Sequence, residues 1–144
     1  MSPARQDPYR NFNFVVEIDG IAAAGFSEVS MPAASVDVIE YREGGNPSVV
    51  RKLPGRIHFG NLMLRRGITA SDELYNWWKT VLDGQTSRRN MAVILMDEAR
   101  NPVKRWVFRE AWPARYQPSG LDARGREVAL ETVEIVFEGM ELAQ

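Results

Sequence analysis

The 144-residue sequence contains no cysteine and a single histidine, His58. Without cysteine the chain has no disulfide, no thiol nucleophile and no cysteine-based metal site. His58 stands between Ile57 and Phe59 in an alternating pattern typical of a strand, and no serine nearby occupies a recognisable nucleophile elbow. Because catalysis near neutral pH needs a group that titrates there, we expect no catalytic residue, no metal site and no cofactor. The sequence therefore predicts a protein that is not an enzyme.

Long hydrophobic runs and an excess of basic charge are also missing. No apolar stretch approaches the length of a membrane span, and the N-terminal residues lack the apolar segment of a signal peptide. The net charge of −1 argues against a chain that must neutralise many nucleic-acid phosphates. We therefore expect a soluble protein, made in the cytoplasm, with no membrane anchor and no sequence-specific nucleic-acid binding. Its length suffices for one domain, residues 1–144, that begins with a polar arm at 1–10.

One helix is predicted, over residues 70–83. Its apolar residues recur at the i, i+3, i+4 and i+7 positions that line one face of a helix. They are Leu74, Trp77, Trp78 and Val81. Gly84 suits the left-handed backbone position just past a helix end. We expect the four apolar residues to anchor the core under a β-sheet, in preference to forming a ligand-stacking platform.

The rest of the chain predicts about seven strands. Alternating or apolar segments lie at 12–19, 25–30, 35–41, 56–66, 89–97, 103–112 and 127–138, and a shorter one lies at 49–53 within a segment predicted as a loop or hairpin. The continuous apolar run within 89–97 indicates a central strand that is buried on both faces. Pro113 is expected to end the strand before it. The predicted fold class is mainly β: an antiparallel β-barrel or two-sheet sandwich with one flanking helix.

Residues 40–55 predict a long loop or hairpin arm, because EGGNPS at 43–48 cannot form regular structure. A long exposed segment on a compact domain suits a contact with a neighbouring molecule. We expect subunit-interface residues in this arm and in the closing strand, which offers glutamates to a partner. The expected residues are Glu40, Arg42, Glu43, Arg51, Lys52, Glu131 and Glu134.

Charge is unevenly distributed along the chain. Residues 51–66 hold five basic residues and no acid, whereas 127–144 hold five glutamates and no base. Two interpretations remain open: neighbouring strands pair these charges within one molecule, or acidic and basic surfaces attract copies head to tail. In the second, Arg51 and Lys52 face an acidic patch such as the closing strand of a neighbour.

Several ordered motifs lie between residues 8 and 142. They are YRNFNFVVEIDG, GFSEVS, EYREGGN, KLPGRIHFGNLMLRRGIT, LYNWW, WVFREAWPARY and EVALETVEIVFEGMEL. In this order they resemble the inner-tube proteins of contractile phage tails and of phage-tail-like contractile injection systems. The segment MPAAS at 31–35 departs from the glycine-rich segments common in that family, which concerns only the shape of this turn.

The resemblance implies a β-barrel subunit that forms hexameric rings, which stack into a hollow tube inside a contractile sheath. Implied partners are copies of the chain itself, a sheath protein, baseplate and cap proteins, and cargo in the lumen, either protein effectors or DNA. It also implies assembly in the bacterial cytoplasm as part of a phage tail or tail-like particle. Two alternatives remain: a monomeric β-barrel that binds a small ligand, and a specialised ring at the end of the tube.

Overall fold

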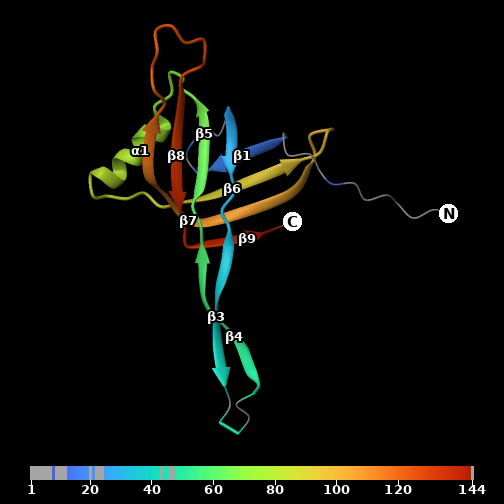
Figure 1. Ribbon diagram of the computed structural model, residues 1–144. Coiled ribbons are helices and arrows are strands. Elements are labelled where there is room, and N and C mark those ends of the chain that lie inside the picture. Colours follow the sequence, from blue (N-terminus) through green and yellow to red (C-terminus); the bar gives the residue numbers. More distant parts are fainter. Residues whose placement is uncertain are drawn as a thin grey trace, which may run out of the picture.

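The computed structural model describes residues 8, 13–19, 21, 25–42, 44–45 and 48–143. Most of the expected N-terminal arm, the first residue of the strand expected at 12–19 and the expected interface residue Glu43 lie outside this set. The described residues form nine strands and one helix (Figure 1). The elements are β1 Phe14–Ile18, β2 Phe26–Ser30, β3 Ala34–Arg42, β4 Val50–Phe59, β5 Leu62–Gly67, α1 Glu73–Leu82, β6 Arg89–Met96, β7 Pro102–Pro118, β8 Leu130–Val136 and β9 Gly139–Leu142. The predicted fold class, mainly β and antiparallel with one flanking helix, is confirmed.

Seven of the strands form one sheet, in the order β1-β6-β7-β8-β5-β2, with β9 paired to β7. Every pairing in it is antiparallel. β6 lies between β1 and β7, and four consecutive residues from Met91 to Ile94 are buried. A strand buried on both faces needs apolar residues at every position, so the prediction of a central strand at 89–97 is confirmed.

β7 continues through Pro113, where the sequence predicted its end. The part of β7 before this point pairs with β6 and β9, and residues 112–118 pair with β8. Glu110 has a positive φ of 52°, and the register with β8 shifts between Pro113 and Arg115. A proline can occupy a bulge because its missing N–H leaves no hydrogen bond unmade there. The prediction that Pro113 ends the strand was wrong: the strand bends there and carries on.

The helix α1 covers the sheet chiefly over β7. Leu74 and Trp77 are fully buried in the core, where Phe108 of β7 also lies. The indole N–H of Trp77 donates to the carbonyl oxygen of Ser87 at 2.7 Å, so the one polar atom of this side chain is satisfied. Trp78, expected as a core anchor, is only partly buried, as is Val81.

The helix ends as the sequence predicted, although it begins three residues later. Gly84 has a φ of +78°, and its N–H donates to the carbonyl of Val81 at 3.1 Å. The N–H of Gln85 donates to the carbonyl of Thr80 at 2.8 Å. These two bonds satisfy carbonyls that have no partner within the helix, as in a Schellman motif.

β3 and β4 form a separate two-stranded ribbon that projects from the body of the molecule (Figure 1). We call β3, β4 and the turn between them the arm. Residues 40–55, predicted as a long loop or hairpin arm, are mostly strand, since β3 runs to Arg42 and β4 begins at Val50. Gly60 closes the foot of the arm, because its N–H donates to the Ala33 carbonyl at 2.8 Å and a Cβ there would lie 3.3 Å from the Ala33 nitrogen.

Candidate subunit interface

The two faces of the arm differ in chemistry. In the β3–β4 register Ile39 lies opposite Leu53, and Tyr41 lies opposite Arg51. Directly opposite residues of an antiparallel pair share a face, and so do residues two apart on one strand. Ile39, Tyr41 and Leu53 therefore line one face, and we call these three residues the apolar face of the arm. They are 51%, 50% and 45% exposed.

The opposite side of the arm carries charge. Glu40 lies opposite Lys52, and Arg42 follows two residues after Glu40 on β3. We call these three residues the charged face of the arm. Arg51 lies on the apolar face, beside Tyr41, so Arg51 and Lys52 point in opposite directions. This register argues against the expectation that both side chains meet the same acidic patch of a neighbour.

The exposure of the apolar face indicates that another molecule covers it. A two-stranded ribbon by itself is only marginally stable in water, and every residue of β3 is exposed. Val36, Val38 and Ile57 are further exposed large apolar residues on the same ribbon, and by the same alternation they lie on the side of Glu40. Exposed apolar side chains gathered on one projecting ribbon of a soluble protein mark a site of protein contact. The alternating sequence at 35–41 carried this signal, but the apolar positions were not among the expected interface residues.

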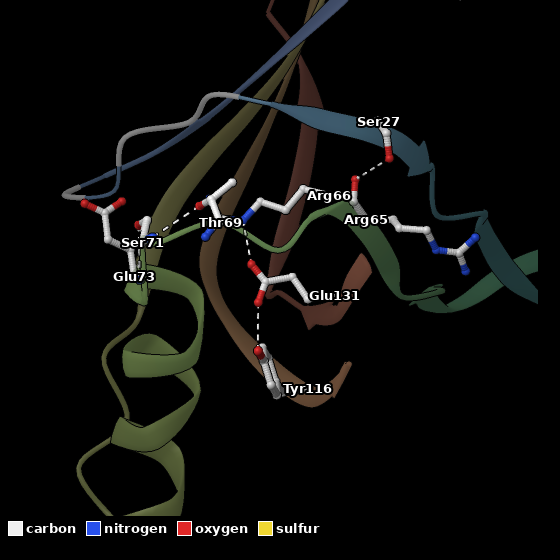
Figure 2. A network of polar contacts seen from close by, with 8 residues as sticks. All are labelled: Ser27, Arg65, Arg66, Thr69, Ser71, Glu73, Tyr116 and Glu131. Carbon is white, nitrogen blue, oxygen red and sulfur yellow. Dashed lines mark hydrogen bonds and ion pairs between the residues drawn. The ribbon is translucent and has the colours of Figure 1, made fainter. Parts of the chain in front are cut away.

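Glu131, which the sequence offered to a partner, is buried inside the subunit. Its Oε1 accepts from Nε of Arg66 at 2.7 Å, and its Oε2 accepts from the hydroxyl of Tyr116 at 2.7 Å (Figure 2). The side chains of Arg66 and Glu131 are each only 5% exposed. The alternation of β8 explains the error, because residue 131 shares its face with the buried residues Val133 and Ile135. Glu131 is therefore excluded from any interface.

The same group of residues shifts the pKa of the Tyr116 hydroxyl. Burial raises the pKa of its hydroxyl to about 12, helped by the hydrogen bond to Glu131 and by the negative charge of that carboxylate. Nη2 of Arg66 is buried without a hydrogen-bond partner among the described residues. The guanidinium lies over the ring of Phe26 at 5.7 Å from its centroid. This network therefore joins β5, β7 and β8 to β2 inside one subunit.

Three further glutamates of the closing segment are also engaged within the subunit. Glu134 accepts from Nδ2 of Asn61 at 2.7 Å. Glu138 pairs with Arg88 at 2.7 Å, and Glu141 pairs with Arg109 at 2.9 Å. Of the two interpretations of the charge blocks, these contacts favour pairing within one molecule over a free acidic face.

Four strand edges of the large sheet lack a second strand partner among the described residues: β1 pairs with β6 alone, β9 pairs with β7 alone, and the other two belong to β2 and to the end of β7. β2 pairs with β5 alone, and residues 112–118 of β7 pair with β8 alone. On the paired side, Ser27 of β2 donates its hydroxyl to the Arg65 carbonyl at 3.2 Å (Figure 2). Unpaired N–H and C=O groups along an open edge are a template for adding a strand from another chain. The edges of β2 and of residues 112–118 bound the part of the sheet built from β7, β8, β5 and β2, and they offer sites for self-association in addition to the arm.

Nothing in the described part of the chain resembles a catalytic or metal centre. No group of three or more His, Asp or Glu residues there is placed to hold a metal ion. The single histidine is exposed on the arm, where its Nε2 lies 3.0 Å from a carboxylate oxygen of Asp37. Within the described residues, no helix is long and apolar enough to cross a membrane.

An antiparallel body with open strand edges and an apolar projecting arm defines a building block that assembles with copies of itself. The chain belongs to the family of the T4-like virus tail tube protein gp19, whose family model matches residues 10–141. As a member it is a structural subunit of an inner tube, and the family is one of tube proteins and not of enzymes. No curated protein matches the chain.

Several solved structures share this fold. A chain of the anti-feeding prophage baseplate, determined with six-fold symmetry, is 26% identical over 96% of this chain and 97% of that chain, with a TM-score of 0.82. A chain of the sheath/tube terminator of PVC, an extracellular contractile injection system, is 24% identical over 98% and 100%, with a TM-score of 0.87. Hcp1 from Flavobacterium johnsoniae is 21% identical over 90% and 94%, with a TM-score of 0.53.

Proposed function

We propose that this protein forms hexameric rings that stack into a hollow tube, with the open strand edges joining subunits within a ring and the arm joining one ring to the next. The observation that carries the proposal is the exposed apolar face of the arm. A monomeric ligand-binding protein would have no use for a projecting apolar ribbon. The assembly rests on contacts between unlike surfaces, which either close into rings or repeat along an axis.

Ring closure uses the edge of β2 on one subunit and residues 112–118 on the next. These segments lie at opposite ends of the path β7-β8-β5-β2, so that joining them continues the sheet from subunit to subunit. Joining them leaves neither of these two edges free, which lowers the risk of uncontrolled aggregation through them. The two edges therefore suit a closed ring better than an isolated subunit.

Stacking uses the arm, which extends away from the body along the direction of β5 (Figure 1). Its nine- and ten-residue strands give it a reach of about 30 Å at the usual rise per residue. This reach suffices to contact a subunit in the adjacent ring. The charged face, with Glu40, Arg42 and Lys52, then lies at the margin of the contact, where water and opposite charges are available.

The remaining partners follow from the tube. Related chains come from an AFP baseplate, a PVC sheath-tube complex and an AFP tube-terminating cap. We propose that this chain likewise meets a sheath protein and baseplate and cap proteins, and that its lumen passes protein effectors or DNA into a target cell. Assembly would take place in the bacterial cytoplasm before the particle is used.

Negative-stain microscopy and mass photometry of purified protein test this function. The wild type should form rings and tubes. The double variant Ile39→Asp, Leu53→Asp places two charges on the apolar face and should give rings without tubes. Leu82→Asp is a matched control, because Leu82 is 66% exposed on the helix, away from the arm. Tubes of normal length from the arm variant, or a wild type that stays monomeric at high concentration, would contradict the proposal.

A further inference from the structure

A second projection lies at the end of the body opposite the arm. Residues 119–129, which connect β7 to β8, form a long loop there (Figure 1). We call it the end loop. Leu121 is 85% exposed and Val128 is 72% exposed, more than any other large apolar residue described in the chain. Neither side chain contributes to the core of the subunit.

The end loop has a defined shape despite this exposure. At its foot, the N–H of Ser119 donates to the Leu130 carbonyl at 2.7 Å, and the N–H of Leu130 donates back to the Ser119 hydroxyl at 2.9 Å. At its tip, the N–H groups of Arg124 and Gly125 donate to Asp122 at 3.0 and 2.9 Å. Between foot and tip the loop surrounds an open hollow of about 1030 Å³. Leu121 and Val128 therefore lie on a loop whose foot and tip are both held by hydrogen bonds.

The position of the end loop relates it to the arm. Rings that stack with the same polarity bring one end of each subunit against the opposite end of a subunit in the next ring. The arm occupies one end of this molecule and the end loop occupies the other (Figure 1). We propose that the end loop of one subunit receives the apolar face of the arm of a subunit in the adjacent ring. This inference rests on the proposed function, because it requires the rings to stack.

The chemistry of the two surfaces is complementary. The apolar face presents two aliphatic side chains and one tyrosine, and the end loop presents a leucine and a valine beside a hollow. Removing such side chains from water favours association without a directional requirement. The end loop also carries two acidic and two basic residues, among them Asp122 and Arg124. These can meet the mixed charges on the margin of the arm. The occupant is thus a second copy of this chain.

The absence of cysteine makes cross-linking a direct test. The double variant Tyr41→Cys, Leu121→Cys carries one thiol on the arm and one on the end loop. A flexible bismaleimide cannot join these two within one subunit, since they lie at opposite ends of it. In assembled tubes it should join successive subunits into a ladder of covalent multimers on a denaturing gel. Tyr41→Cys, Val128→Cys should behave in the same way, whereas the control Tyr41→Cys, Leu82→Cys should give no ladder.

A second measurement uses stacking itself. Leu121→Ser, Val128→Ser should still form rings but should raise the protein concentration needed for stacking about tenfold for each side chain lost. The inference fails if tubes of both thiol variants give no ladder, if the Leu82 control gives an equal ladder, or if the serine variant stacks like the wild type. In those cases a stacking defect of the arm variant Ile39→Asp, Leu53→Asp would leave the proposed function standing. Unaltered stacking of that arm variant would overturn both.

Discussion

Phe59, the last residue of β4, lies with its ring centroid 5.4 Å from that of Phe137, which follows β8. The ring of Phe137 in turn meets Phe108 edge-on at 4.9 Å, and Phe108 is fully buried. Three aromatic rings therefore connect the foot of the arm to the core of the body. Because a ribbon of two strands is flexible by itself, this connection fixes the direction in which the arm projects.

Truncating Phe59 should weaken both the fold and the stacking of rings. Phe59→Ala removes the ring that contacts Phe137, and because Phe59 is only partly buried we expect a loss of about 1–2 kcal/mol in the free energy of unfolding, below the usual cost for a fully buried phenylalanine. Urea denaturation measures this loss, and microscopy measures the length of the tubes. Phe59→Leu retains most of the volume and is the matched control. Wild-type stability and tube length in Phe59→Ala would contradict the role given to this contact.

The buried pair of Arg66 and Glu131 yields a second prediction. Glu131→Ala leaves the guanidinium buried without its carboxylate, which should cost about 3–5 kcal/mol in the free energy of unfolding. The double variant Arg66→Met, Glu131→Leu removes both charges and should recover most of this loss. Both are measured by urea denaturation.

An exposed ion pair provides the control. Glu28 and Arg65 lie 3.0 Å apart with side chains 57% and 41% exposed, so Glu28→Ala should cost less than about 1 kcal/mol. If Glu131→Ala costs no more than Glu28→Ala, the carboxylate of Glu131 is not held in a buried pair.

The raised pKa of Tyr116 predicts a dependence of stability on alkaline pH. The pKa of its hydroxyl is 10.0 in an unperturbed tyrosine and about 12 here, so the folded state holds the proton more tightly than the unfolded chain does. This contribution is fully present below pH 10 and is lost as the pH rises from 10 to 12. Tyr116→Phe lacks the titrating group, so the difference in stability between wild type and Tyr116→Phe should shrink across this interval. Urea denaturation at closely spaced pH values measures it, and a constant difference would contradict the assignment.

The sequence predicted the elements that depend on local patterns. Helix α1 followed from the spacing of its apolar residues, and β6 followed from an unbroken apolar run. Pro113 was misjudged because a bulge, set by the pairing of β7 with β8, absorbs it. Glu131 was wrongly predicted to be exposed because it lies in a segment rich in glutamates. Its burial depends on the pairing with Arg66, which is 65 residues away in the chain. Tertiary pairing of this kind leaves no local signal.

The interface residues of the arm could also not be predicted from local sequence patterns alone. Alternation at 35–41 predicted a strand there, and the register of β3 against β4 decides which residues share a face. That register separates Arg51 from Lys52 and gathers Ile39, Tyr41 and Leu53. The interface residues predicted in the arm were all charged, whereas the fold also leaves the apolar face of the arm uncovered.

The open edges of the large sheet give the last prediction, which concerns ring closure. Residues 26–30 and 112–118 each lack a second strand partner within the described chain, so some of their amides depend on water for hydrogen bonds. If neighbouring subunits pair these edges, their amides should exchange with deuterium more slowly in rings than in unassembled protein separated by size-exclusion chromatography. Residues 130–136 are the internal control, because β8 is already paired on both sides by β5 and β7 and should gain little protection. Equal exchange of the two edges in rings and in unassembled protein would mean that side chains, and not strand pairing, hold the ring together.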